Sequence, residues 1–183
     1  MKLSDILQIA TMCVAVISIF ISNMLGGISE KKRFLRDQKL KRYTKFYIPL
    51  VQKMYNVNPK YFDYFNLQKL HLIDDFTDMI SSNFEFIGAK TAPLYSKFMI
   101  IGAKAYSDWN AATYSHLTGI ISLEDATKEL IDANHALNQL VEDLLLESAQ
   151  LSQELGLEDI STPLLISFRN APNHKLECTL RHK

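Results

Sequence analysis

Twenty consecutive residues near the N-terminus, Ile6 to Leu25, contain no charged side chain. As a helix they would be roughly 30 Å long, which is the thickness of the hydrocarbon core of a bilayer. Ten of them are Leu, Ile, Val or Phe, and together these favour membrane insertion by roughly 3–6 kcal/mol. A buried core helix and a cleaved signal peptide are the alternatives, but only Lys2 precedes the apolar run and no Ala-x-Ala site follows it. Residues 1–27 are therefore predicted to form an N-terminal transmembrane anchor.

The anchor carries a stripe of polar and small residues spaced three and four apart. At this spacing the side chains share one face of a helix, and small or hydroxyl side chains are typical of contacts between transmembrane helices. The stripe consists of Gln8, Thr11, Ala15, Ser18 and Ser22. It predicts a homo-oligomer formed through the membrane. The alternative is that each hydroxyl bonds back to its own helix.

The formal net charge of zero hides an uneven distribution of the two signs. Between residues 31 and 45 there are eight basic side chains and one acid, Asp37. We call these eight the collar: Lys31, Lys32, Arg33, Arg36, Lys39, Lys41, Arg42 and Lys45. From Phe46 onward there are eleven basic and seventeen acidic residues, a net charge of −6. Because positive charge beside a membrane helix favours the cytoplasmic side, we expect the N-terminus outside and the rest of the chain inside a cell membrane.

Residues 28–57 are predicted to form a basic amphipathic helix, with Leu40, Tyr43, Tyr47, Leu50 or Val51, and Met54 on its apolar face. Gly26 and Gly27 could act as a hinge, and Pro49 should kink or restart the helix. Basic residues next to an anchor attract anionic lipid head groups by about 1 kcal/mol each. Nucleic-acid phosphates are an alternative partner for the same charges, and a solvated face is another.

Residues 58–156 are predicted to form a cytoplasmic helical bundle, so the fold class is all-α. The first expected helix is capped by Asn58, starts at Pro59 and runs to Gly88; the second runs from about Pro93 to Thr113, with Gly102 weakening it by roughly 1 kcal/mol. The third begins after Ser122 and ends near Leu155, with Gly156 beyond it. Its wide apolar stripe, interrupted by Asn134 and Ser148, favours packing within the chain over a coiled coil. Residues 157–183 are expected to be a loosely packed tail with one extended piece from Pro163 to Phe168.

Two sets of side chains have a spacing that could hold a divalent metal ion. His71, Asp74, Asp75 and Asp78 would share one face of a helix, and Asp132, His135 and Glu142 have similar spacing. Charged residues at this spacing are more often the solvated side of a helix, so neither set is taken as a metal site. No catalytic or cofactor-binding motif is present, and Cys13 and Cys178 suggest neither a disulfide framework nor a metal knuckle. We therefore expect no enzyme activity and no cofactor.

The uncharged helix followed by LRDQKLKRYTKFYIPL resembles a recurring design among small bacterial membrane-anchored proteins. Many of these are carried by prophages, and some act in superinfection exclusion. The resemblance covers about residues 5–51, including Tyr47, Pro49 and Leu50, and carries no catalytic residue. It implies a protein that binds a partner at the inner face of the membrane and could block phage DNA entry. A membrane-bound metal-dependent enzyme and an anchored nucleic-acid binder are the alternatives.

Overall fold

A computed structural model describes the backbone of residues 3–58, 62–114 and 121–171. Side chains 3–16, 19, 20, 23, 25 and 114 lie outside this description. All regular structure in the described ranges is helical, which confirms the all-α prediction. The chain divides into two compact units, Met1–Lys41 and Arg42–Lys183, and each is described by itself.

The first unit is nearly all of helix α1 (Leu3–Arg42), which continues through Gly26 and Gly27 without a break. Every residue from 26 to 41 is exposed, and the basic residues in this stretch face all sides of the helix. Lys31, Lys32 and Arg33 are consecutive, so rotation by 100° per residue points them in three directions. Residues 28–41 therefore bury no apolar face among the described residues, and the amphipathic helix predicted for this stretch stays a prediction.

The amphipathic pattern is correct from Tyr43 onward. Tyr43 and Tyr47 are buried in a π-helical turn, η1 (Tyr43–Tyr47), and Leu50, Val51 and Met54 are buried in α2 (Ile48–Tyr55). Pro49 lies in the first turn of α2. Its ring would crowd the preceding turn of an α-helix, and it has no N–H group to donate. The wider π-helical turn η1 before it relieves both problems. The interruption predicted near Pro49 is confirmed.

The segment predicted as one helix from Pro59 to Gly88 is three short helices. These are α3 (Tyr64–Lys69), α4 (Leu72–Ser81) and the 3-10 helix η3 (Phe84–Phe86). The cap of α3 is Asp63, whose side chain accepts the N–H of Asn66, and not Asn58; Pro59 lies outside the described residues. Leu67 and Ile73 would point about 120° apart on one continuous helix, so the break at His71 allows both to be buried.

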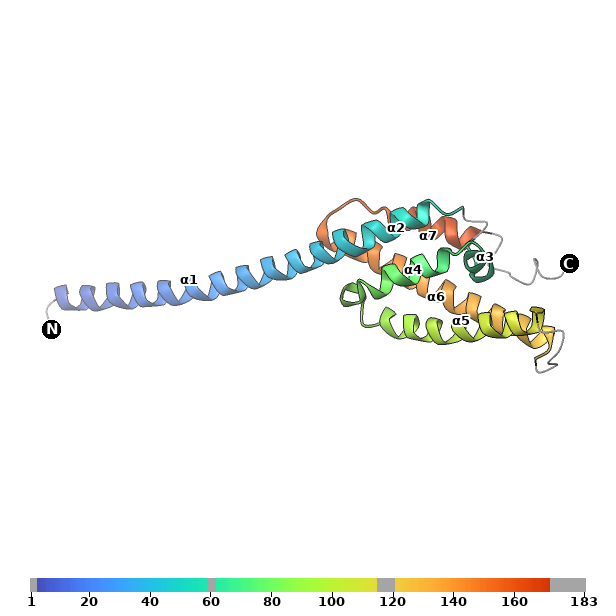
Figure 1. The fold of residues 1–183 in the computed structure, drawn as a ribbon. Coiled ribbons are helices and arrows are strands. Elements are labelled where there is room, and N and C mark those ends of the chain that lie inside the picture. Colours follow the sequence, from blue (N-terminus) through green and yellow to red (C-terminus); the bar gives the residue numbers. More distant parts are fainter. Residues whose placement is uncertain (1–2, 59–61, 115–120, 172–183) are drawn as a thin grey trace. The chain divides into compact units, whose positions relative to one another are not determined.

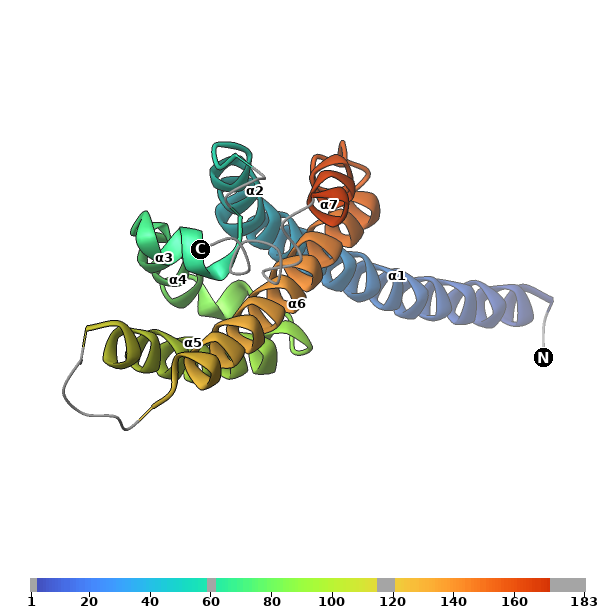
Figure 2. The ribbon, with the colours of Figure 1, turned by 90° about the vertical axis from the view of Figure 1, so that its right-hand side faces the viewer.

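The bundle is organised around α6 (Leu123–Leu155), whose predicted start and end are confirmed. Ser122 accepts the N–H of Asp125, and Gly156 ends the helix at a positive φ of 70°. Figures 1 and 2 show α6 between α5 (Thr91–Tyr114) on one side and α2 with α7 (Ser161–Asn170) on the other. A single core of aliphatic and aromatic side chains joins these helices.

Helix α7 replaces the extended piece expected at Pro163 and Phe168. Proline is tolerated in the first turn of a helix, where its missing N–H has no helical partner to lose. The Asp159 side chain accepts the N–H groups of Ser161 and Thr162 at 2.9 and 3.0 Å. Leu164, Leu165 and Phe168 are buried, so residues 161–170 are packed against the bundle and not loose.

Candidate interaction surface on helix α5

Helix α5 is apolar on both of its sides. Its inward side buries Phe98, Gly102 and Ala105 in the described core. Its outward side exposes Ile100 by 73%, Met99 by 41% and Tyr106 by 42%. We call these three residues the α5 ridge; Met99 and Tyr106 lie on one side of the helix, and Ile100 points about 100–120° away from them. Large exposed apolar side chains gathered on one part of a surface make that part a candidate binding site.

Gly102 fixes how closely α3 approaches α5. A Cβ atom at this position would lie 3.2 Å from the ring of Tyr64, which is tighter than ordinary contact. The Tyr64 hydroxyl donates to the Gly102 carbonyl at 2.6 Å, and its ring packs edge-on against Phe98. Burial, with smaller contributions from Tyr106 and Asp74, raises the pKa of Tyr64 to about 12. The glycine that weakens α5 in isolation is therefore what lets the bundle close here.

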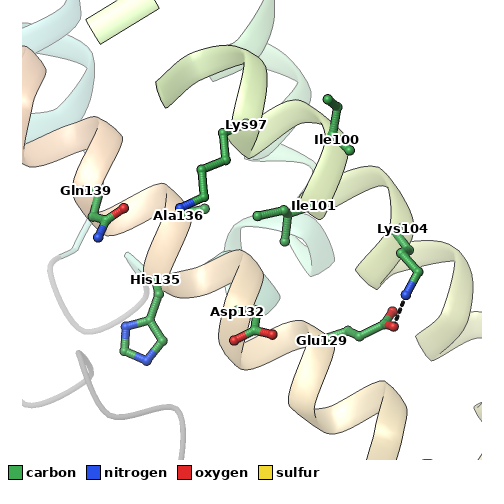
Figure 3. A pocket seen from close by; sticks show the side chains of 9 residues that line it. All are labelled: Lys97, Ile100, Ile101, Lys104, Glu129, Asp132, His135, Ala136 and Gln139. Atoms are coloured by element: carbon green, nitrogen blue, oxygen red, sulfur yellow. Dashed lines mark hydrogen bonds and ion pairs between the residues drawn. The ribbon is translucent and has the colours of Figure 1, made fainter. Parts of the chain in front are cut away.

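One hollow, with a volume of about 450 Å³, lies between α5 and α6. Figure 3 shows its lining residues, with the two helices forming opposite walls. They are Lys97, Ile100, Ile101 and Lys104 from α5, and Glu129, Asp132, His135, Ala136 and Gln139 from α6. Ile100, the most exposed member of the ridge, forms one edge of this hollow.

Two of the charged residues in this hollow are paired with each other, and two are not. Lys104 is paired with Glu129 and lies 3.7 Å from Asp108; the hydrogen bond that Lys104 donates to Glu129 raises the pKa of Lys104. The other Glu129 oxygen, Oε2, is buried and has no hydrogen-bond partner among the described residues. Lys97 on the α5 wall and Asp132, beside Glu129 on the α6 wall, are both exposed, and neither forms an ion pair within the described ranges.

A second hollow, of about 440 Å³, lies on the other flank of α5, against α3 and α4. Met99 and Tyr106 from the ridge line it, together with Gln68, His71 and Asp74. An adjoining hollow of about 250 Å³ is lined by Phe65 and Trp109, whose rings pack edge-on at 5.4 Å. The α5 ridge therefore stands between two depressions that contain both aromatic and polar side chains.

The metal candidates are not brought together. His71 lies in the left-handed region (φ 57°) just before α4, so it does not share a helix face with Asp74, Asp75 and Asp78. Of the second set, Asp132 and His135 line the α5–α6 hollow. Glu142 instead accepts a hydrogen bond from the Nε of Arg169 at 2.6 Å. Within the described part of the chain, no group of three or more His, Cys, Asp and Glu side chains could hold a metal ion.

The collar separates into a main group and Arg42. The side chains of Lys31, Lys32, Arg33, Arg36, Lys39, Lys41 and Lys45 are exposed, so lipid or nucleic-acid contact stays a prediction for them. Arg42 instead donates from Nη2 to Glu147 and to the Tyr47 hydroxyl, each at 3.0 Å, and from Nε to the Phe86 carbonyl. Its guanidinium is held by these bundle groups, and the lipid or nucleic-acid contact stays a prediction for Arg42 as well.

The predicted anchor falls largely on side chains that the structure does not describe. Of the association stripe, Gln8, Thr11 and Ala15 lie outside the described side chains, and Ser18 and Ser22 are exposed on α1. Within the described residues, no helix has an apolar stretch long enough to cross a membrane. The self-association face stays a prediction.

Sequence reasoning placed α5 correctly but missed its outward face. The spacing of apolar residues assigns Leu94, Phe98, Ile101, Ala105 and Trp109 to the buried side of this segment and gives no role to Met99, Ile100 and Tyr106. A signal was present, because apolar residues occur on every side of this segment instead of along one stripe. Lys97 and Glu129 were missed because their importance depends on which helix lies beside α5.

Comparison with known proteins adds no further constraint. No protein-family model, no curated protein and no solved structure matches the chain.

Proposed function

We propose that the chain is a membrane-anchored, non-enzymatic protein that binds a protein partner through the outward face of α5, at the cytoplasmic side of a bacterial membrane. The observation that carries the proposal is the α5 ridge, with Ile100 exposed by 73% between two hollows. Large apolar side chains beside concave, partly polar walls are typical of binding surfaces.

The anchoring part of the proposal rests on the segment from Ile6 to Leu25 and on the collar that follows it. A helix with basic side chains on all sides suits a position in the head-group layer, where anionic lipids surround it on every side. Positive charge on the C-terminal side of the apolar segment supports an orientation with the body inside the cell.

The anchor is tested by placing charge in it. In a Val14→Lys/Ile17→Lys variant, two ammonium groups near the bilayer centre each oppose insertion by roughly 3 kcal/mol. We expect this variant to leave the membrane fraction after carbonate extraction, while the Gln38→Lys control, with its added charge in the collar, stays. Equal retention of both variants would contradict anchoring by this segment.

Superinfection exclusion is the biological setting that we propose for this binding activity, and its support is the resemblance over residues 5–51. It is tested by plaque counts and by phage DNA injection in bacteria that express the full chain, the Ile100→Glu variant or the Ile166→Glu variant. Ile166 is exposed by 54% on α7, away from the ridge. We expect plaques and injection to be reduced by the chain and by Ile166→Glu, but not by Ile100→Glu. Plaque numbers equal to those of empty cells for all three would overturn this setting.

A further inference from the structure

We propose that the partner of the α5 face is the same face of a second copy of this chain. The inference rests on the proposed function and names its partner. Most soluble homodimers are two-fold symmetric, so one surface must complement itself in both shape and charge. The α5 face has both properties.

In shape, the face combines a ridge and hollows in a single chain. Ile100 is exposed by 73% and borders the 450 Å³ hollow, and Met99 and Tyr106 border the 440 Å³ hollow. A two-fold contact allows the ridge of each copy to enter a hollow of the other. An apolar side chain transferred from water into such a hollow loses most of its exposed surface, which is the main source of association free energy.

In charge, the face carries one exposed basic residue and one exposed acidic residue that form no ion pair among the described side chains. Lys97 projects from α5 and Asp132 from α6, on opposite walls of the same hollow (Figure 3). Neither has an ion pair among the described side chains, whereas Lys104 and Glu129 in the same hollow are paired with each other. Two-fold docking lets the Lys97 of each copy approach the Asp132 of the other copy. A second copy therefore matches both charges, whereas a partner whose surface is only acidic or only basic would match one of them.

Anchoring strengthens the argument for a second copy. Two anchored copies share one membrane and one orientation, so their bodies meet at a much higher effective concentration than free proteins would. A face of modest size can then associate at concentrations where free copies would stay apart. The anchor stripe could add to the contact, so the test must report on α5 and not merely on whether the chain is oligomeric.

Disulfide cross-linking of the full chain in membranes tests the α5 contact directly. In a Cys13→Ser/Cys178→Ser background, one variant carries Ile100→Cys and the matched control carries Ile166→Cys, both at exposed apolar positions. After mild oxidation we expect the covalent dimer to be at least tenfold more abundant for Ile100→Cys. Collisions caused by the anchor alone affect both variants, so equal yields would overturn the proposal.

A charge exchange then tests the symmetry. Lys97→Glu and Asp132→Lys, each made in the Ile100→Cys chain, place like charges opposite one another at both symmetric contacts, and we expect each to lower the cross-linked fraction several-fold. The double variant restores opposite charges and should recover the original yield. Failure of the double variant to recover, with its helical circular dichroism intact, contradicts the two-fold contact.

The same membrane preparations separate this inference from the proposed function. Chain that remains in the membrane pellet but shows no Ile100-specific cross-link overturns the second copy as partner and leaves the anchor standing. Chain that is absent from the pellet contradicts the proposed function itself.

Discussion

Helices α5 and α6 lie side by side, yet they distribute their apolar residues in opposite ways. Apart from the exposed Leu123 and Leu146, α6 keeps its large apolar residues on one wide stripe, and Leu137, Leu140 and Leu144 on that stripe are completely buried. α5 divides them between the core and the solvent, so that Phe98 is buried while Ile100 is exposed. The stripe of α6 is accounted for by folding alone. The outward residues of α5 are not among the buried core residues, and the proposed interface gives them a role.

The comparison is tested most strongly by truncating one residue on each helix. Leu144→Ala removes a completely buried side chain of α6 and should lower the free energy of unfolding by about 2–5 kcal/mol. Ile100→Ala removes a side chain that is mostly in water, and its effect should stay within about 0.5 kcal/mol. Urea denaturation followed by circular dichroism measures both. A loss of several kcal/mol for Ile100→Ala would place that residue in the core and remove the basis of the comparison.

The buried polar residue on α6 provides a second test. Asn134 is 1% exposed, and its Oδ1 accepts the backbone N–H of Tyr64 at 3.0 Å. Asn134→Ala leaves that N–H at the start of α3 without a partner, so we expect a loss of about 1–3 kcal/mol in the free energy of unfolding. The exposed Gln139→Ala is the control and should change little. Equal effects of the two substitutions would mean that Asn134 does not hold α3 in place.

Alkaline pH should weaken the packing of α3 on α5. The folded pKa of Tyr64 is raised to about 12 from the ordinary value of 10.0, mainly by burial, so the folded state keeps this proton more tightly. The resulting stability is fully present below pH 10 and is lost as the pH rises through 12. At about 1.4 kcal/mol per pKa unit, the loss is on the order of 2 kcal/mol.

Denaturation curves between pH 9 and 12 measure this effect, with Tyr64→Phe as the comparison. The variant lacks the hydroxyl that donates to Gly102, so it should be less stable at pH 8 but should decline less steeply above pH 10. Tyr43, Tyr47 and Tyr95 also have raised pKa values, and their contribution is common to both proteins. Parallel declines in the two proteins would contradict a raised pKa at Tyr64.

The smallest expected effect concerns the glycine in α5. Gly102→Ala gains about 1 kcal/mol of helix propensity, but its Cβ would press on the Tyr64 ring, which is held at both its hydroxyl and its face. We expect no net stabilisation, or a loss of up to about 1 kcal/mol. Ser107→Ala, at an exposed position of α5, should be slightly stabilising instead. A clear gain for Gly102→Ala in the melting temperature would show that the two helices can move apart at little cost.

Local sequence signals were sufficient where a helix depends on its own residues. Ser122 and Gly156 mark the ends of α6 because capping and a positive φ are properties of single residues. Asn134 and Ser148 were recognised as interruptions of the α6 stripe, but their roles depend on residues far away in the chain. The Asn134 side chain accepts a hydrogen bond from the Tyr64 backbone N–H, and the Ser148 hydroxyl accepts one from the Ser161 hydroxyl. Such partners cannot be identified before the packing is known.

The predictions that were wrong also depended on contacts between distant parts of the chain. The break at His71 follows from the need to bury both Leu67 and Ile73, and α7 forms because Asp159 and the core stabilise a segment that contains Pro163. The inward turn of Arg42, which was not predicted, likewise depends on Glu147, more than one hundred residues later. On the candidate surface, the sequence singled out Asp132 and His135 only as possible metal ligands. It did not single out the ridge, because the exposure of a side chain is a property of the folded bundle.

The central claim is that the outward face of α5 is an interface, and energy transfer between labelled copies in bilayers tests it most directly. Full chains carrying donor or acceptor labels at the C-terminus are compared as the unmodified protein, Ile100→Glu and Ile166→Glu. We predict that transfer persists in the unmodified protein and in Ile166→Glu, and falls to the level of random encounters in Ile100→Glu. Transfer in Ile100→Glu equal to that of the unmodified protein would contradict the claim.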